Sequence, residues 1–341
     1  MVIVLTEPAR HRALLWAAGL GLATLLGLFA TAVGTLLPVV GAPVIAVLVG
    51  GLLSPYARRR AEAVEPGLTL AKGTLLQLSV VLLGAQLSIA EVLRVGAGSL
   101  PVMLGTLAVC LLLAWQLGRK LGVPRDLRTL IGVGTGICGA SAIAATTPAI
   151  RARSTDVAYA ISTIFLFNVA AVVVFPPLGR ALGLSEHAFG LFAGTAVNDT
   201  SSVVAAASAY GPDAAQYAVV VKLARTLMII PIVLGLTALT RRRDGLPSAS
   251  GARRMFSLIP WFLPAFLATA ALHSAGLIPA AVGPVAHQAA LLLIAIALAA
   301  VGLSTDVAAL RRAGPRPLLL GLVLWVAVSG TSLALQLLVG G

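Results

Sequence analysis

Residues 189–207 read FGLFAGTAVNDTSSVVAAA, and the polar run inside this stretch decides how the rest of the chain is interpreted. Asn198, Asp199, Thr200, Ser201 and Ser202 separate two apolar segments. A carboxylate and four hydrogen-bonding side chains are costly at membrane depth unless they bind a ligand or one another. An ionisable residue in such a place is a functional-site hypothesis by default.

Composition places this run in a membrane. Of 341 residues, 59% are hydrophobic and 10% are charged, whereas a soluble domain is about 25% charged. Long apolar runs recur along the chain and predict an all-α polytopic membrane protein, with residues 1–341 forming a single integral membrane domain. The net charge is +13, but the basic residues cluster in short loops without a recognition motif. We therefore expect no nucleic-acid partner.

The apolar pattern predicts eleven hydrophobic elements. The first is too long for a typical signal-peptide core of about 7–15 residues, so we expect an uncleaved span. The predicted elements are residues 14–37, 39–54, 69–90, 100–117, 129–150, 157–178, 188–209, 214–240, 256–275, 285–304 and 317–339.

Basic residues orient these elements. If the elements alternate from a cytoplasmic N-terminus, most of the 24 Lys and Arg residues fall in inside loops. We expect a protein of a bacterial inner (plasma) membrane, and the positive-inside rule predicts that its N-terminus is cytoplasmic and its C-terminus outside.

Two arginines do not fit this alternation. Simple crossing places Arg151 and Arg153 outside and Arg180 inside. Arg151 and Arg153 move inside if 129–150 dips into the membrane and returns, and 188–209 must then re-enter from the other side. Non-helical backbone is tolerated at this depth only where it is buried in protein or lines a cavity. Interrupted spanning helices and re-entrant hairpins are both compatible with the sequence.

Two internal matches indicate inverted repeats. With an offset of 60, Gly134-Thr135 matches Gly194-Thr195, and Ser141, Ile143 and Ala145 match Ser201, Val203 and Ala205. With an offset of 216, the Leu-Ser, Gly, Pro and Leu-Gly positions of 87–105 match those of 303–321. A pair of interrupted elements in corresponding positions is the best sequence indication of a transporter binding site. Chance matching among small, common residues is the alternative.

These motifs carry a family resemblance. Residues 134–145, 198–206 and 221–231, and the late Gly302-Leu303-Ser304-Thr305-Asp306, resemble in this order the signatures of the sulfate exporter family (YeiH-like). The resemblance covers essentially the whole chain and implies an inverted-repeat secondary carrier with paired broken helices. Some members have a His-Glu pair and a Gln where this chain has Asn198-Asp199 and Ser202, so substrate and coupling ion do not carry over.

The ionisable residues are the strongest candidates for a site. Asp199 could carry a coupling proton, ligate a cation or balance Arg225, or it could simply cap a helix. Lys222 and Arg225 lie on one face of 214–240, roughly 12 and 17 Å from its outer end. Cations at that depth suit an anionic substrate, and an ion pair with Asp199 is the structural alternative.

Residues of the partner element complete the candidate site. Gly permits close approach of the backbone to a ligand, and a half-helix N-terminus offers N–H groups to an anion. Packing of small residues is an equally good explanation. The residues expected to line the site here are Thr135, Cys138, Gly139 and Ser141.

We therefore expect a secondary transporter that exports a small anion (sulfate, sulfite or an organosulfonate) by alternating access, coupled to a proton or ion. The alternatives are a cation/proton antiporter and a non-transporting membrane receptor or assembly protein. No phosphate-binding loop or nucleophile–base set occurs, so we expect neither an enzyme nor a cofactor or metal. Membrane lipid is an expected partner, and a homodimer is left open.

Overall fold

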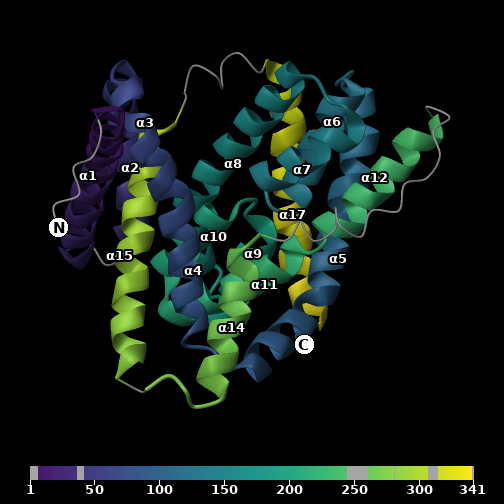
Figure 1. Cartoon of the computed structure of the whole chain (residues 1–341). Helices are drawn as coiled ribbons and strands as arrows, with labels where there is room; N and C mark the ends of the chain where they lie inside the picture. Colours follow the sequence, from purple (N-terminus) through teal and green to yellow (C-terminus); the bar gives the residue numbers. More distant parts are fainter. Residues whose placement is uncertain (1–6, 37–41, 244–259, 280, 306–313, 340–341) are drawn as a thin grey trace. The chain divides into compact units, whose positions relative to one another are not determined.

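The computed structural model describes residues 7–36, 42–243, 260–279, 281–305 and 314–339, and every regular element in these ranges is a helix (Figure 1). Within these ranges, seven helical segments are long and apolar enough to cross a membrane, and α7 and α14 are shorter apolar helices. The prediction of an all-α polytopic membrane protein is therefore confirmed. The chain divides into two compact units, Met1–Ser88 with Ala265–Asp306, and Ile89–Pro264 with Val307–Gly341. Whether they form one functional domain stays a prediction.

Glycines allow the helices of the first unit to pack closely. A Cβ atom at Gly50 would lie 2.6 Å from the Ala299 carbonyl oxygen, and one at Gly67 would lie 2.4 Å from the backbone nitrogen of Leu20. Small residues bring membrane helices together in this way. The helices are α1 (Glu7–Leu36), α2 (Ala42–Arg59), α3 (Ala61–Leu70), the π-helical turn η1 (Ala71–Leu75), α4 (Leu76–Gly84), α14 (Phe262–Ser274) and α15 (Val282–Leu303).

The predicted element 100–117 is wrong at its start, because α5 (Ile89–Lys120) already begins at Ile89. The predicted element 69–90 is also wrong at its start, because α3 already begins at Ala61. Glu62, Glu65 and Pro66 are residues typical of a polar loop before the membrane. In the structure they extend the helix, and Val64 and Leu68 from the same turns are buried in an apolar cluster with α1 and α15. Tertiary packing outweighs the local polarity here.

The second unit contains the remaining helices. Its core surrounds the short helices that correspond to the predicted elements 129–150 and 188–209. The helices are α5 (Ile89–Lys120), α6 (Arg125–Gly136), α7 (Ala140–Ile150), α8 (Ser154–Ala181), α9 (Glu186–Ala196), α10 (Thr200–Tyr210), α11 (Pro212–Thr226), α12 (Ile229–Arg243) and α17 (Pro315–Val339).

Helices α6 and α7 form a re-entrant hairpin. A Cβ atom at Gly134 would lie 3.0 Å from the Ile143 side chain, so the two helices run back along each other from their break. At the open end, Arg125 and Asp126 from the start of α6 line one small pocket with Ile150 from the end of α7. Because both ends of 125–150 lie together, this segment does not cross the unit.

Helices α9 and α10 form a second hairpin. The carboxylate of Glu186, at the start of α9, accepts hydrogen bonds from the backbone N–H groups of Asp213 and Ala214, just beyond the end of α10. The rings of Phe189 and Tyr210 also stack, with centroids 3.9 Å apart. Both ends of 186–210 therefore lie together as well.

The two hairpins enter from opposite ends of the unit. The first ends next to the start of α8, and the second begins after the far end of this 28-residue helix. Figure 1 shows α6 and α7 in the upper part of the unit and α9 to α11 below them. The structure thus decides for hairpins and against interrupted spans.

The hairpins place three arginines as the re-entrant alternative predicts. Arg151 and Arg153 lie at the same end as Arg125, and Arg180 lies at the opposite end of α8. Arg180 has a local function there, because its guanidinium donates a 2.7 Å hydrogen bond to the Ala209 carbonyl near the end of α10. A cation is favourable beside the last carbonyls of a helix.

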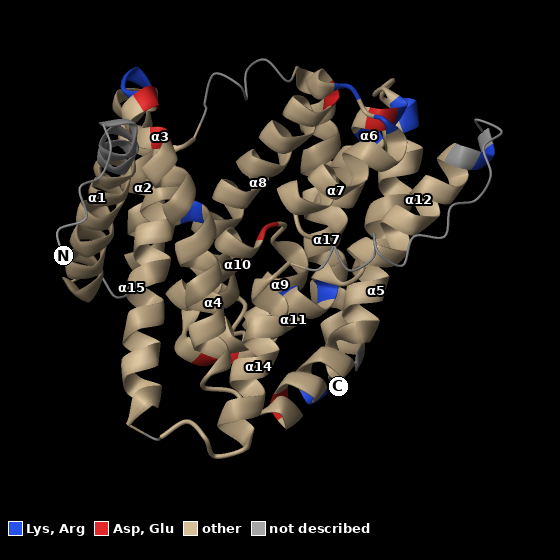
Figure 2. Ribbon diagram, in the orientation of Figure 1, with Lys and Arg blue, Asp and Glu red and all other residues tan. Residues whose placement is uncertain are grey.

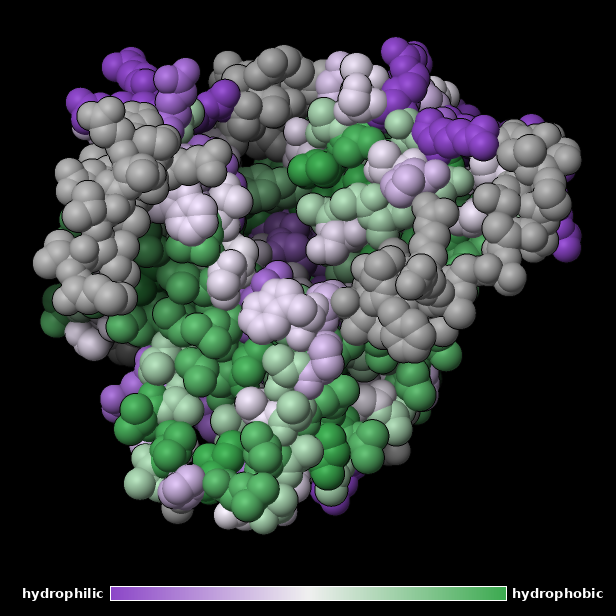
Figure 3. Space-filling model, viewed as in Figure 1, coloured by the Kyte–Doolittle hydropathy of each residue, from purple (hydrophilic) through white to green (hydrophobic). Residues whose placement is uncertain are grey.

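Charge and hydropathy follow the membrane pattern. Figure 2 shows most charged residues near helix ends, with a blue segment inside the tan ribbon of α11 and a red one next to α10. In Figure 3, hydrophobic side chains cover much of the surface over α14 and α15. Exposed Leu267, Leu272 and Leu291 belong to these two helices. Such surfaces suit contact with lipid.

Candidate substrate site at the tips of two opposed hairpins

The tips of the two hairpins touch. Helix α6 ends at Gly136 and α7 begins at Ala140, while α9 ends at Ala196 and α10 begins at Thr200. Gly139 has φ +67° and ψ −130°, a conformation that residues with a side chain rarely adopt. A Cβ atom at Gly139 would lie 3.1 Å from Cβ of Asp199. The breaks in both hairpins therefore meet inside the second unit.

Asp199 caps helix α10. Its carboxylate accepts a 3.0 Å hydrogen bond from the backbone N–H of Ser202, a 2.7 Å bond from the Ser202 hydroxyl and a further bond from the Ser201 hydroxyl. The negative charge also faces the positive end of the helix dipole. Asp199 is half-buried, so its carboxylate is held at the break without being sealed in the core.

Asn168 of α8 binds the backbone at the same break. Its Oδ1 accepts hydrogen bonds from the backbone N–H groups of Asn198, at 3.1 Å, and Asp199, at 3.4 Å. Asn198 is 1% exposed, and its own Oδ1 has no hydrogen-bond partner among the described residues. A buried acceptor without a partner is unusual and is favourable only if a ligand or water reaches it.

Lys222 of α11 joins the two hairpins. It is fully buried, and its Nζ donates one hydrogen bond of 2.8 Å to the Ile137 carbonyl and one of 2.8 Å to the Val197 carbonyl. Each acceptor is the first residue after the first helix of a hairpin. The ammonium therefore satisfies carbonyl groups that the breaks leave without helical partners.

Arg225 makes the same connection three residues later. Its Nε donates a 2.7 Å hydrogen bond to the Gly136 carbonyl, and its Nη1 donates to the Thr195 carbonyl. Its Nη2 is buried and has no partner among the described residues. Like Lys222, the guanidinium lies at the negative ends of α6 and α9, where a cation is favourable.

The four helix ends at the tips thus differ in whether a charged side chain compensates them. Lys222 and Arg225 neutralise the C-terminal ends of α6 and α9, and Asp199 caps the N-terminal end of α10. The N-terminal end of α7 follows Gly139, which offers no side-chain cap, and Ala140 and Ser141 next to it are exposed. An uncapped helix N-terminus beside two cations and one carboxylate is electropositive.

Most of the chain is similar to known proteins. Residues 18–321 match a protein family described as Conserved hypothetical protein 698. The chain belongs to this family. The match includes both hairpins and α11, so the tip architecture lies within the region that defines the family.

Curated relatives cover almost the full length. The chain is 43% identical over 328 residues to a UPF0324 membrane protein of Streptococcus pneumoniae strain R6, covering 95% of this chain and 97% of the relative. A UPF0324 membrane protein of Streptococcus pyogenes serotype M18 is 43% identical over 332 residues, covering 94% and 97%. One of Streptococcus agalactiae serotype V is 38% identical over 314 residues, covering 90% and 92%. No solved structure matches the chain.

These names establish a membrane protein and state no substrate. The predicted membership of a membrane protein family is confirmed, whereas the resemblance to the sulfate exporter family stays a prediction. Membrane localisation is likewise supported, and the inner membrane and the orientation of the termini stay predictions.

The structure brings together most residues that the sequence selected. Asn198, Asp199, Ser201 and Ser202 lie around the cap of α10, and Thr200 is its first residue. The remaining selected residues differ in environment: Thr135 is 1% exposed, Cys138 is buried in an apolar cluster with Ala142 and Ile229, and Gly139 and Ser141 lie at the tip and the start of α7. The ion pair considered between Asp199 and Lys222 or Arg225 does not form in this part of the described chain, since both cations bind carbonyl groups.

Two groups at the breaks are not among the site residues predicted from the sequence. Asn168 anchors the break of the second hairpin, and the buried Thr195 hydroxyl contacts that of Ser332 on α17 at 2.7 Å. The only sequence signal for either is a polar residue within an apolar span. Such residues commonly bridge helices, so the signal does not identify a site.

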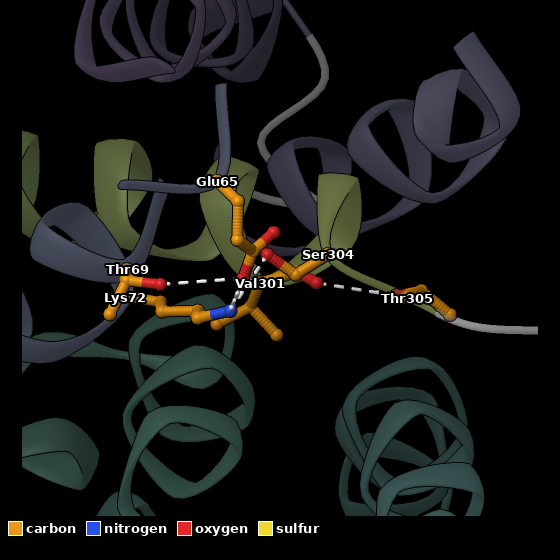
Figure 4. A network of polar contacts seen from close by, with 6 residues as sticks. All are labelled: Glu65, Thr69, Lys72, Val301, Ser304 and Thr305. Carbon is orange, nitrogen blue, oxygen red and sulfur yellow. Dashed lines mark hydrogen bonds and ion pairs between the residues drawn. The ribbon is translucent and has the colours of Figure 1, made fainter. Parts of the chain in front are cut away.

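In the first unit, Lys72 lies in η1 and forms its own polar network (Figure 4). Its Nζ contacts Glu65 Oε1 at 2.9 Å and Ser304 Oγ at 3.1 Å, and Ser304 belongs to the late motif of the chain. Asp306 of the same motif lies outside the described residues.

Proposed function

We propose that this protein is a secondary carrier that moves a small anion across the membrane by alternating access. The observation that carries the proposal is the pair of opposed re-entrant hairpins that meet tip to tip. Paired interrupted elements near the middle of a repeat structure are where secondary carriers place substrate and coupling ions. The sequence match between Gly134-Thr135 and Gly194-Thr195 supports an inverted repeat, because each pair precedes the break of its hairpin by the same distance.

The charge around the tips favours an anion. Two buried cations and one carboxylate leave a formal charge of about +1, and the uncapped N-terminus of α7 adds about half a positive charge. The backbone N–H groups of Ala140 and Ser141 and the Ser141 hydroxyl are the groups we assign to the anion. An oxyanion such as sulfate, sulfite or an organosulfonate matches these donors.

We assign Lys222 and Arg225 a structural role, although their charge alone suggests direct binding of the anion. Their hydrogen bonds already go to the carbonyl groups at the breaks after α6 and α9, so we assign them to holding the two tips together. Their positive charge still favours an anion nearby. Among their nitrogen atoms, Nη2 of Arg225 has no hydrogen-bond partner among the described residues and can contact a ligand directly.

Asp199 is the candidate coupling group. It is the ionisable acid at the break, it is half-buried, and protonation would change both the charge of the tips and the cap of α10. Binding of a proton there and of an anion at α7 would favour each other electrostatically, which is the linkage that a coupled carrier needs.

Transport in vesicles tests the proposal. Purified protein in liposomes should accumulate radiolabelled sulfate, sulfite or a short organosulfonate under a proton gradient. Asn is as good an N-cap as Asp, so Asp199→Asn should preserve folding and abolish the dependence of flux on the gradient. Asp213→Asn, an exposed acid at the start of α11, is the matched control. Equal gradient dependence in wild type and Asp199→Asn would refute the coupling role.

A cation/proton antiporter is the second candidate, and one observation favours it. The buried Oδ1 of Asn198 has no partner among the described residues and lies one residue from the Asp199 carboxylate, so two oxygen acceptors are close in sequence at the break. In that case, proton flux in the same liposomes should respond to Na⁺ or K⁺ and be indifferent to oxyanions. A complete lack of flux with every solute would instead favour a receptor or assembly protein.

A further inference from the structure

A groove on the second unit is separate from the hairpin tips. It lies between α5, α6 and α12, has a volume of 540 Å³, and opens to the surface. That volume is within the range of small-molecule sites, about 300–1,000 Å³. None of its lining residues belongs to the candidate substrate site, so the groove needs an explanation of its own.

Most of the groove is apolar. Leu111 and Ala114 of α5 and Gly132 and Val133 of α6 form one part of its wall, and α12 contributes a further apolar part. Gly235 on α12 is notable because a Cβ atom there would meet no atom within 4 Å. Because Gly235 also lines the groove, a side chain introduced at this position would begin in open space.

Basic residues stand at one end of this apolar groove. Arg125 and Arg128, from the first turn of α6, line it together with Thr129. Asp126 is an acidic residue nearby, and it lines a smaller pocket with Arg125. The two arginines outnumber this acid, so the end of the groove keeps a net positive charge.

Trp115 of α5 connects the groove to a second group of cations. Its side chain lines the groove and is 56% exposed. It also lines a neighbouring cavity of 590 Å³ together with Gln116, Arg119 and Lys120. Four cations therefore surround one exposed, amphipathic ring at this end of the unit.

We propose that this groove binds an anionic phospholipid, with its phosphate on Arg125 and Arg128 and an acyl chain along the apolar wall. Basic pockets between transmembrane helices on the cytoplasmic side commonly receive anionic headgroups. The end of the unit that carries these arginines also carries Arg151 and Arg153, and the positive-inside rule places such an end in the cytoplasm. Trp115 is suited to the headgroup region because its ring is amphipathic.

The combination of surfaces selects a lipid over other ligands. A small anion would use the arginines and leave the apolar wall without a partner. An apolar molecule would use the wall and leave the arginines unused. Leu239 lines the groove and is 54% exposed, and Leu112, which follows the lining residue Leu111 on α5, is 57% exposed. These helices therefore also present a surface that suits acyl chains. The inference does not depend on the proposed transport function.

Lipid binding to the purified full-length protein in detergent tests the inference. Dioleoylphosphatidylglycerol should raise the melting temperature and remain bound in native mass spectrometry, whereas dioleoylphosphatidylcholine and inorganic phosphate should not. Two variants should lose most of both effects: Arg125→Gln with Arg128→Gln, which removes the headgroup charges, and Gly235→Leu, which fills the groove from an open position.

Matched controls exclude general effects of charge and size. Arg94→Gln removes an exposed cation near the start of α5, and Gly330→Leu adds the same bulk on α17 at a glycine that also has open space around it. Both should bind the lipid like the wild type. Equal protection by phosphatidylcholine or by phosphate alone overturns the inference, as does undiminished binding in Gly235→Leu. If the double arginine variant fails to fold, Gly235→Leu alone still tests the inference. A dimer that disappears in Gly235→Leu while lipid retention is unchanged would overturn it in favour of a second copy of the chain.

Discussion

At the residue scale, Lys222 and Arg225 show that a buried cation can be stabilised by backbone carbonyl groups. The sequence leaves two roles open, substrate ligands or an ion pair with Asp199, because two cations at membrane depth need a compensating partner. The structure provides carbonyl groups at the breaks after α6 and α9 as these partners. The breaks and the cations therefore depend on each other: without the breaks the carbonyls would be occupied, and without the cations they would be unpaired.

Replacing Lys222 by Met tests this dependence. The variant keeps a side chain of similar length and leaves the carbonyls of Ile137 and Val197 without their donor. An unpaired buried acceptor costs about 1–3 kcal/mol, so we expect a clear drop in melting temperature in detergent. Arg94→Met, which removes an exposed cation, should leave it nearly unchanged. A melting temperature equal to that of the wild type would contradict the capping role.

Gly139 is the second prediction at this scale. Ala at this position must adopt φ +67° and would place its Cβ 3.1 Å from that of Asp199. Gly183 provides a matched control, because it has φ +65° and a Cβ atom there would meet no atom within 4 Å. Backbone strain of about 1–3 kcal/mol applies to both Ala variants. Only Gly139→Ala should also reduce flux in liposomes, and equal flux in the two variants would show that the tip contact is dispensable.

At the scale of elements, the two hairpins explain features that crossing helices leave unexplained. Gly190 and Gly194 of α9 lie against α11, where a Cβ at Gly194 would come within 2.7 Å of the Val221 side chain. Since α11 returns beside α9, Lys222 and Arg225 reach the tips of both hairpins. The two hairpins thus share one helix that supplies the donors for both of their breaks.

Labelling of introduced cysteines tests the hairpins directly. Positions 125 and 154 flank the first hairpin, and positions 182 and 213 flank the second; all four residues are exposed. A membrane-impermeant maleimide should label Arg125→Cys and Ser154→Cys from one side only, and Leu182→Cys and Asp213→Cys from the other side only. The native Cys110 and Cys138 are buried and should react slowly. Labelling of positions 125 and 154 from opposite sides would mean that the first segment crosses the membrane.

At the scale of the whole molecule, the distribution of basic residues gives a predicted orientation. With hairpins, Arg151 and Arg153 join Arg125 and Arg128 at one end, so the asymmetry becomes stronger than simple crossing allows. The exception, Arg180, is held by the Ala209 carbonyl and lies over the Tyr210 ring. The positive-inside rule then favours a cytoplasmic N-terminus and an external C-terminus.

Reporter fusions check this orientation. A fluorescent protein that folds only in the cytoplasm should be bright at the N-terminus and dark at the C-terminus. Alkaline phosphatase, active only outside the cytoplasm, should give the reverse pattern. Fusions at both ends with the same activity would show an even number of crossings and would refute the predicted topology.

The sequence was most informative where a single physical property decides the outcome. Apolar length located the membrane elements but not all of their starts. Helices α3 and α5 begin at Ala61 and Ile89, before the predicted starts at 69 and 100, and the start of α3 is stabilised by packing rather than by hydropathy. The polar run at Asn198–Ser202 marked the break before α10, since Asp and Ser are strong helix caps. Asn168 could not be singled out in the same way, because its role depends on which backbone groups α8 faces.

The sequence by itself determined that this is a helical membrane protein, where its apolar elements lie, and that ionisable residues near 199 and 222–225 fall within apolar segments. These properties follow from composition, periodicity and the cost of placing charge in lipid. Only the tertiary structure decided that 125–150 and 186–210 are hairpins and that Lys222 and Arg225 bind carbonyl groups. Both depend on contacts between residues far apart in the chain, such as Glu186 with Asp213, and local patterns carry no information about such pairings.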